Sequence, residues 1–139
     1  MKMTDEIRKE VQIAKTTKDP QVLRKLLRNT YNIIDNWVSQ YVVSNPNCPP
    51  DILKEIFNQG NEDWISYNAA KNPNCPEEIL VEILKKGYDN YMSQCAAENP
   101  SCPKEMLVEI LKREKCDLVS CNAALNPNCP PEILVEIKI

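Results

Sequence analysis

Residues 72–80 read Asn-Pro-Asn-Cys-Pro-Glu-Glu-Ile-Leu, and closely similar stretches begin at positions 45, 99 and 126. The four copies are spaced by 27 residues without a gap. Positions between the copies keep the same step, so that the serine at position 66 returns at 93 and 120. A fixed period of this length is typical of solenoids, in which each unit buries its apolar face against its neighbours. The sequence therefore predicts a tandem repeat protein.

The period predicts a single solenoid domain that covers residues 1–139. We expect a capping helix at 1–16, a diverged repeat at 17–44, full repeats at 45–71, 72–98 and 99–125, and a half repeat at 126–139. The diverged repeat carries about three extra residues, because the apolar pair at 22–23 stands 30 residues before the pair at 52–53. In the capping helix, Thr4 is a candidate N-cap, and Ile7, Val11 and Ala14 share one face.

Each repeat is predicted to contain two helices. Apolar residues at 79, 80, 83 and 84 follow the spacing of an amphipathic first helix, which Cys-Pro-x-acid introduces. This pattern makes the residue before the proline the N-cap, which assigns structural N-caps to Cys48, Cys75, Cys102 and Cys129. Gly60 and Gly87 are expected to end the first helix, whereas Glu114 in their place predicts a different turn. A short second helix, near 62–71, 89–98 and 116–125, ends before each Asn-Pro.

The composition of the 139 residues excludes several classes of protein. Apolar residues make up 42% and charged residues 27%, as in ordinary globular chains, and this composition excludes disorder. No apolar run approaches the roughly 20 residues of a membrane helix, and no signal peptide is recognisable. The absence of histidine removes the commonest general base and mixed Cys/His zinc sites. Seven cysteines, an odd number, predict free thiols in a reducing compartment, which favours the cytoplasm.

The repeated Asn-Pro-Asn-Cys-Pro-Pro-Glu-Ile-Leu phrase, which follows a short helix ending in Ala-Ala, resembles the leucine-rich-repeat variant family of bacterial proteins. The resemblance covers about 35–139, and 17–34 more weakly. It implies an all-α, right-handed solenoid of paired helices, the second helix short or partly 3₁₀, and a binding scaffold without enzymatic activity. The chain departs from the family in its 27-residue step, its serine column and its cysteine in place of threonine. No cysteine precedes Cys48, so the iron–sulfur module found in the founding member is not expected.

A column of large residues at the start of the second helices is the preferred candidate for a function. Exposed aromatic residues that recur along a solenoid form a contact stripe. We predict that the stripe binds a protein partner of basic and apolar character through Trp37, Trp64, Tyr67, Tyr91, Asp35, Glu62, Asp63 and Asp89. The alternative is that these rings fold back over the groove between repeats as an outer layer of the core.

Two rival functions remain open. The first is nucleic-acid binding, with candidate phosphate contacts at Arg8, Lys9, Arg24, Lys25 and Arg28. Residues 1–28 carry a net charge of +4, but residues 29–139 carry −7, which disfavours nucleic acid. The second is redox sensing or metal binding by the cysteines at helix N-termini, where the helix dipole lowers thiol pKa values. Residues one repeat apart are too distant for a disulfide or a shared metal, so capping is the favoured role of these cysteines.

The sequence supports three further expectations. The asparagine column (Asn45, Asn72, Asn99 and Asn126) is expected to close the local turn before each proline and to bond to its counterpart in the next repeat. No catalytic residue, cofactor or metal is expected, because the carboxylate pairs lie on solvated faces. The apolar end of the chain, with Val135 and Ile139, suggests a homodimer formed by the C-terminal half repeat.

Overall fold

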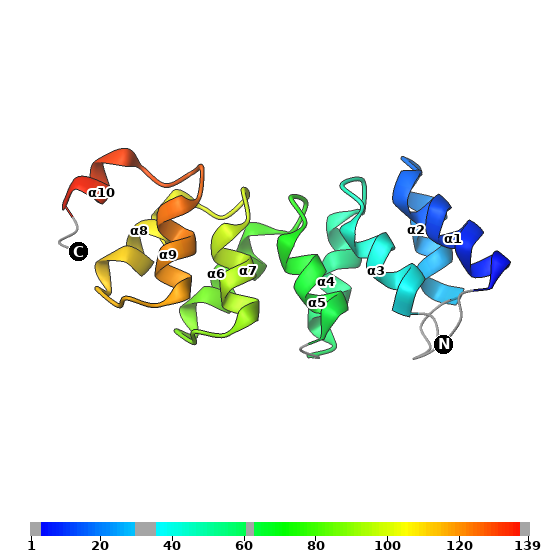
Figure 1. The fold of residues 1–139 in the computed structure, drawn as a ribbon, viewed down its shortest axis with the longest axis horizontal. Helices are drawn as coiled ribbons and strands as arrows, with labels where there is room; N and C mark the ends of the chain where they lie inside the picture. Colours follow the sequence, from blue (N-terminus) through cyan, green and yellow to red (C-terminus); the bar gives the residue numbers. More distant parts are fainter. Residues whose placement is uncertain (1–3, 30–35, 61–62, 137–139) are drawn as a thin grey trace. The chain divides into compact units, whose positions relative to one another are not determined.

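The computed structural model describes residues 4–29, 36–60 and 63–136, in which all regular structure is α-helical and no strand occurs (Figure 1). This observation confirms the predicted all-α class. The helices are α1 (Asp5–Thr16), α2 (Pro20–Asn29), α3 (Asn36–Ser44), α4 (Pro50–Asn58), α5 (Trp64–Lys71), α6 (Glu77–Lys85), α7 (Tyr91–Glu98), α8 (Lys104–Lys112), α9 (Leu118–Leu125) and α10 (Pro131–Glu136). None of the described helices is long and apolar enough to span a lipid bilayer.

The helix boundaries follow the 27-residue period of the sequence. The first helices α4, α6, α8 and α10 begin at residues 50, 77, 104 and 131, and the second helices α5, α7 and α9 begin at 64, 91 and 118. Helices α2 and α3 begin at residues 20 and 36, outside this register, as expected for a diverged repeat. The second helices α5, α7 and α9 are short, at eight residues each, and the described residues contain no 3₁₀ segment.

The chain forms two compact units, Met1–Asn74 and Cys75–Ile139. In the first unit, α3 packs against both α1 and α5, while α2 covers α3 and α4 covers α5. Its core is formed by the buried side chains of Val11, Ala14, Leu23, Leu27, Val38, Val42, Val43, Cys48, Ile52, Leu53, Ile56, Ala69 and Ala70. The first helices thus contribute mainly leucine and isoleucine, and α5 contributes alanines that allow close helix packing.

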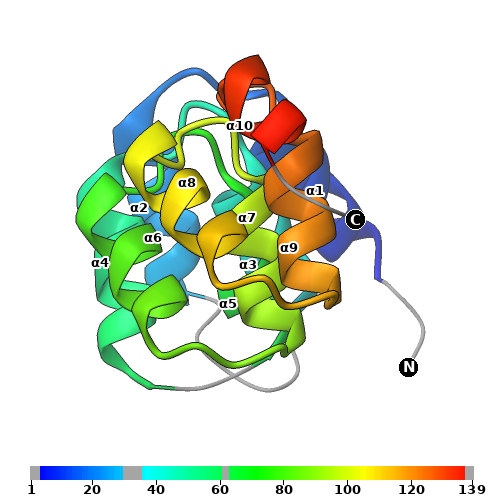
Figure 2. The same cartoon turned by 90° about the vertical axis from the view of Figure 1, so that its left-hand side faces the viewer.

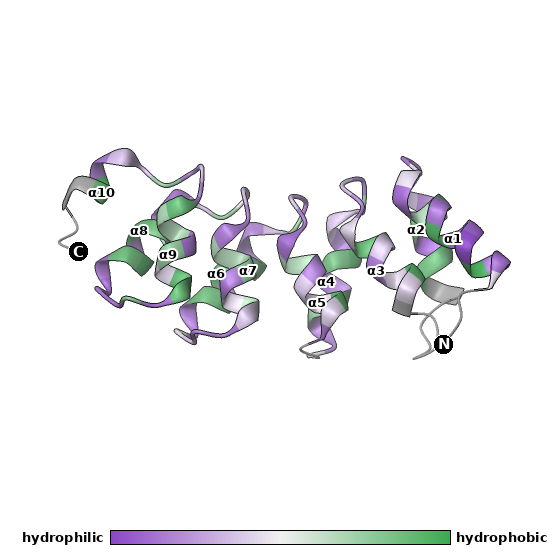
Figure 3. Cartoon of the chain, viewed as in Figure 1, coloured by the Kyte–Doolittle hydropathy of each residue, from purple (hydrophilic) through white to green (hydrophobic). Residues whose placement is uncertain are grey.

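The second unit repeats this arrangement. Helix α7 packs against α9, while α6 covers α7 and α8 covers α9, as Figure 2 shows for the last pair. Its core is formed by Cys75, Ile79, Leu80, Leu84, Met92, Cys95, Ala96, Ala97, Cys102, Met106, Leu107, Ile110, Leu111, Val119, Ala123, Cys129 and Ile133. In Figure 3, α6 and α8 each carry hydrophobic and hydrophilic segments in alternation, which is the pattern of amphipathic helices.

Buried asparagines hold the loops between helices in place. The Asn72 side chain donates hydrogen bonds from Nδ2 to the carbonyl oxygens of Val43 (2.7 Å) and Asn45 (2.9 Å). Its Oδ1 accepts a hydrogen bond from the Asn74 amide at 2.8 Å, which closes the turn at the proline. In the second unit, Asn126 bonds in the same way to Ala97 and Asn99. For these residues the structure confirms both predicted roles, the local turn and the bond to the counterpart asparagine.

Helix α1 occupies the position of a second helix. The Asn45 side chain donates from Nδ2 to the carbonyl oxygens of Ala14 (2.7 Å) and Thr17 (2.9 Å), at the end of α1. These bonds match those that Asn72 makes at the end of α3. Thr4 accepts a hydrogen bond from the Ile7 amide at 3.2 Å and is the N-cap of α1, as predicted.

The prediction that cysteine is the N-cap of each first helix is wrong by one residue. The N-caps of α4, α6 and α8 are Pro49, Pro76 and Pro103, and none of the three makes a side-chain capping bond. The carbonyl of Pro49 accepts the first helical hydrogen bonds instead, from the amides of Ile52 and Leu53. The residue before a proline is restricted to extended conformations. Cys48, Cys75, Cys102 and Cys129 therefore precede the helices, and their side chains are buried.

The first helices end in the same turn in both units. Gly60 and Gly87 both have φ of +74°, and each follows its helix as predicted. Glu114 also adopts a left-handed conformation, with φ of +57°. The expectation of a different turn after α8 is therefore wrong. Glu114 adopts the same left-handed conformation as the two glycines. Its amide donates to the Leu111 carbonyl, as the Gly87 amide donates to the Leu84 carbonyl.

Candidate functional site

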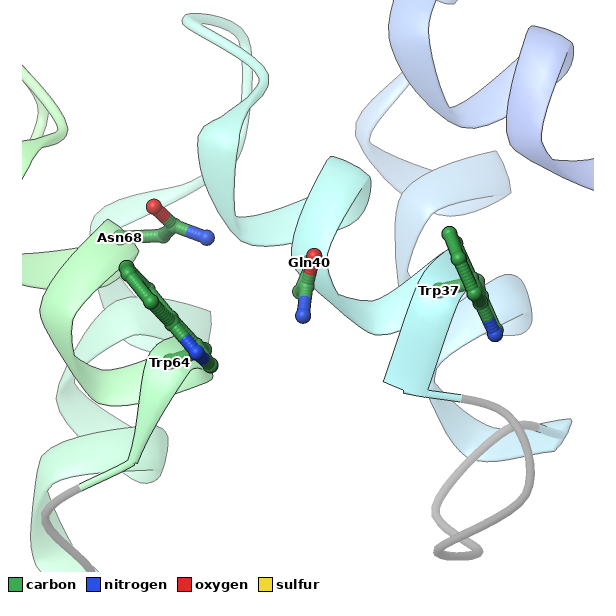
Figure 4. A pocket seen from close by; sticks show the side chains of 4 residues that line it. All are labelled: Trp37, Gln40, Trp64 and Asn68. Atoms are coloured by element: carbon green, nitrogen blue, oxygen red, sulfur yellow. The ribbon is translucent and has the colours of Figure 1, made fainter.

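An open groove of about 450 Å³ lies between α3 and α5 in the first unit (Figure 4). Trp37 and Gln40 of α3 and Trp64 and Asn68 of α5 line it. Figure 4 shows one indole on each helix. The Gln40 amide lies between the two indoles, and the Asn68 amide points toward Gln40. The indoles are 44% (Trp37) and 61% (Trp64) exposed, so they do not form an outer layer of the core.

Helical periodicity places these side chains on the surface. In α3, Val38 and Val42 are fully buried and mark the face of the helix that packs on the core. Trp37 and Gln40 lie on the other face. In α5, Ser66 and the two alanines at 69–70 face the core, which leaves Trp64 and Asn68 on the opposite arc. The small buried residues let α5 approach α3 closely, and the bulk of both tryptophans remains outside.

Tyr67 supports one of the two indoles. Its ring meets that of Trp64 edge to face, with 6.0 Å between the ring centroids and 83° between the planes. Tyr67 itself is half-buried. Such aromatic pairs are favourable, so Tyr67 restricts the orientation of an otherwise exposed indole. This predicted binding residue therefore lies beside the groove and orients one of its walls.

Two of the four predicted acidic binding residues have structural roles. Asp63 is the N-cap of α5 and accepts a hydrogen bond from the Ser66 amide at 3.0 Å. Asp89 belongs to the second unit, where it accepts a hydrogen bond from the Val119 amide at 3.2 Å. Both carboxylates remain exposed to solvent. The other two acidic residues, Asp35 and Glu62, lie outside the described residues.

The walls of the groove carry almost no charge. Helix α3 contains no charged residue, and α5 contains only Lys71, in its last turn. Lys15 of α1 places its Nζ 4.5 Å from the ring centroid of Tyr41 on α3, a cation–π contact within the same unit. The groove is therefore lined by aromatic rings and amides, and the carboxylate of Asp63 lies at the N-terminal end of α5, next to Trp64.

The second unit also exposes large residues at the corresponding positions of its second helices. Tyr91, at the start of α7, is 39% exposed, and Leu118, at the start of α9, is 58% exposed. Leu125 and Leu134 are exposed as well, at 82% and 41%. Val135 and Ile139, on which the homodimer expectation rests, lie outside the residues whose side chains are described.

One of the candidate phosphate-binding residues is already engaged. Arg24 forms an ion pair with Asp51 of the next first helix, with 2.7 Å between Nη1 and Oδ2 and a second bond of 2.9 Å. The hydrogen bond from Arg24 lowers the pKa of Asp51. Arg24, a candidate phosphate contact, thus takes part in an ion pair between helices. Arg8, Lys9 and Lys25 are exposed, and the Arg28 side chain lies outside the described part of the chain.

The cysteine row is not poised for thiolate chemistry. Burial raises the pKa of Cys48, Cys75 and Cys102 to about 12, and it also raises that of Cys129. The sequence had suggested lowered pKa values for these thiols, whereas burial raises them. All seven cysteines are free thiols, with Cys116 and Cys121 exposed. Among the described residues, no three His, Cys, Asp or Glu side chains are grouped so that they could hold a metal ion.

Sequence reasoning missed the two amides of the groove. Gln40 and Asn68 occupy adjacent columns of the repeat, one turn after each tryptophan. An amide side chain at i+3 or i+4 from each aromatic residue was the available signal. Comparisons of the chain with protein-family models, curated proteins and solved structures gave no match. The residues and their geometry are therefore the basis for the function proposed below.

Proposed function

We propose that the two units continue one right-handed α-solenoid of two-helix repeats, as the resemblance to the leucine-rich-repeat variant family implies. The common 27-residue step of the helix boundaries supports this proposal, as does the matching use of Asn72 and Asn126 within the two units. A repeat array of this kind offers an extended surface on which recognition residues recur. Its function would then be binding and not catalysis.

The protein is proposed to act as an interaction scaffold that binds a protein partner in the cytoplasm. The observation that carries this proposal is the pair of exposed tryptophans in one groove. Tryptophan is among the residues most enriched in the energetic centres of protein interfaces, because its large rigid ring buries much area at a low entropic cost. Two exposed indoles without a structural role in the core are otherwise an aggregation liability.

The rival functions have less support. Nucleic-acid binding loses Arg24, which is paired with Asp51, and the helices that line the groove carry a single basic residue. Redox sensing or metal binding by the cysteine row is disfavoured by burial and by the raised pKa values of its thiols. Protein binding is therefore the function to test first.

The test is affinity purification from the source organism with the tagged wild-type chain and a Trp37→Ala/Trp64→Ala variant. We expect a specific partner to copurify with the wild type and to be lost from the double variant. Tyr88→Ala is the matched control, because Tyr88 is also an aromatic residue with 61% exposure but lies outside the groove. Identical partners for all three proteins would exclude the groove as the binding site.

A further inference from the structure

We propose that the groove between α3 and α5 binds a proline-rich peptide segment in the polyproline II conformation, with a basic residue at one end. This inference rests on the proposed function and specifies its partner. Three properties of the groove support it, namely its aromatic walls, its amides and the distribution of charge around it, together with the usual spacing of packed helices.

The aromatic walls suit proline rings. Trp37 and Trp64 present large, flat, half-exposed indoles on two neighbouring helices. A proline side chain is a compact apolar ring that packs against such a surface, and aromatic-lined grooves recognise proline-rich segments in this way. The segment is already stiff before binding, so an open, shallow groove has less conformational entropy to overcome.

The amides suit a backbone that lacks internal hydrogen bonds. A polyproline II segment leaves its carbonyl oxygens unbonded, and its prolines have no N–H to offer. Gln40 and Asn68 line the groove between and beside the indoles, and each carries an NH₂ group that donates two hydrogen bonds. A docked α-helix would satisfy its own backbone and would leave these two donors without a matching acceptor. The amides therefore favour an extended, acceptor-rich occupant.

The usual spacing of packed helices is similar to the pitch of this conformation, and α3 and α5 are packed against each other. Packed helices lie about 8–10 Å apart. A polyproline II helix rises 3.1 Å per residue with three residues per turn, which is about 9 Å per turn. Residues three apart in the peptide would therefore meet α3 and α5 in succession, one tryptophan each. An extended β-strand repeats its side-chain direction after about 7 Å and matches this spacing less well.

The charges favour a neutral segment with a basic end. Helices α3 and α5 contribute only Lys71, in the last turn of α5, while the exposed carboxylate of Asp63 marks the N-terminal end of α5. Residues 29–74 contain five acidic and two basic side chains. A basic residue at the end of the segment would complement Asp63, and a charge within the segment would be desolvated against the neutral walls without a partner.

The chain provides its own probe for this site. Trp37 and Trp64 are the two tryptophans of the sequence, so intrinsic tryptophan fluorescence reports on the groove alone. We would titrate the wild-type chain with a blocked peptide of one arginine followed by three Pro-Ala-Pro triplets. The expected result is a saturable blue shift of the emission at micromolar to millimolar peptide. Replacing the prolines by alanine should abolish the shift, and replacing the arginine by glutamine should weaken binding and remove its salt dependence.

The protein variants test the amides. Gln40→Ala and Asn68→Ala should each weaken peptide binding by up to about tenfold, the effect of one hydrogen bond. Gln94→Ala is the matched control, because Gln94 occupies the column of Gln40 in the second unit and should bind as the wild type does. Circular dichroism of each variant checks that the fold is retained, and the peptide controls test the proposal on the wild-type chain.

Three results would overturn the inference. They are the absence of a saturable shift with the proline peptide, equal binding of its alanine counterpart, and tighter binding of an amphipathic helical peptide or a single-stranded oligonucleotide. The proposed function would survive all of the peptide results if the Trp37→Ala/Trp64→Ala variant still loses its copurifying partner. If the proline peptide fails and the partner is also retained, both proposals are wrong.

Discussion

At the scale of the single residue, a buried asparagine joins segments that are distant in the sequence. Asn72 is 2% exposed, and its amide joins two loops through bonds to the carbonyls of Val43 and Asn45. Without this side chain the Asn45 carbonyl would keep its bond from the Cys48 amide, whereas the bond to the buried Val43 carbonyl would be lost together with the acceptor of the Asn74 amide. The free energy of unfolding should therefore depend strongly on this side chain.

We predict that Asn72→Ala lowers the free energy of unfolding by about 2–4 kcal/mol, since it removes two buried bonds to backbone carbonyls and the acceptor of the Asn74 amide. Asn72→Asp should cost more at neutral pH, because a carboxylate would face two carbonyl oxygens. Part of that loss should return as the pH falls and the buried carboxyl takes up a proton. Urea denaturation at two pH values measures these effects.

Asn58→Ala is the control for both variants, because Asn58 is exposed at the end of α4 and should change stability little. A change for Asn72→Ala no larger than that for Asn58→Ala would contradict the role assigned to the buried amide.

The sequence predicted the turn that the asparagine side chain closes within its own loop. An Asn-Pro dipeptide at a fixed period indicated a turn closed by the asparagine side chain, and a bond to its counterpart was a natural extension. The second acceptor, Val43 for Asn72 and Ala14 for Asn45, depends on how far one helix is displaced along its neighbour. That displacement results from side-chain packing and is not encoded in the repeat length.

At the scale of the element, the turns that end the first helices show where pattern reasoning failed. Glycine at residues 60 and 87 indicated a left-handed turn, and glutamate at 114 was taken to exclude one. A left-handed conformation costs a non-glycine residue about 1–2 kcal/mol. The packing of α8 against α9 and the bond from the Glu114 amide to the Leu111 carbonyl outweigh this cost.

Glu114→Gly should therefore stabilise the protein, by about 0.5–1 kcal/mol after allowance for the greater entropy of glycine in the unfolded state. The reciprocal change Gly87→Ala should destabilise it by about 1 kcal/mol, although nothing lies near the added Cβ atom. Thermal denaturation of the two variants measures both effects. An unchanged midpoint for Glu114→Gly would show that the left-handed conformation is not strained.

The helix starts were predicted to within one or two residues. The Cys-Pro pattern located each first helix, but Pro49, Pro76 and Pro103 take the N-cap position that was assigned to the cysteines. A proline can occupy either the N-cap or the first helical position, because its fixed φ is compatible with both. The N-caps of the second helices are Asp63, Asn90 and Asp117, each just before the column of large residues. Of these three, Asp63 was predicted to be a binding residue of the stripe.

At the scale of the whole molecule, the thiols fall into two groups. Cys116 and Cys121 are exposed, and the other five are buried. Thiol reagents attack the thiolate, and a pKa raised by burial keeps a thiol protonated at neutral pH. We therefore predict that two thiols react rapidly with a coloured disulfide reagent near neutral pH, and that five react at the rate of unfolding.

All seven thiols should react at once in denaturant, and Cys116→Ser/Cys121→Ser should lose the rapid phase without a loss of stability. Rapid reaction of more than two thiols in the native protein would contradict the burial of the cysteine row. It would also restore redox sensing as a candidate function.

The candidate site was predictable in part for the same reason as the fold. The period aligned Trp37, Trp64 and Tyr91 in one column, and the small residues around them indicated which face is buried. The groove was not predictable, because it depends on which side chains of α3 and α5 face each other across the contact, and the roles of Asp63 and Asp89 depend on local capping geometry.

The direction of the asparagine bonds has a consequence for synthesis. In each unit the amide bonds to an earlier segment: that of residue 45 to the end of α1, that of 72 to the end of α3 and to residue 45, and that of 126 to the end of α7 and to residue 99. Every acceptor therefore leaves the ribosome before the donor that needs it. Translation can thus proceed with each new layer docking on a finished one, and none of these asparagine amides has to wait for a segment that has yet to be made.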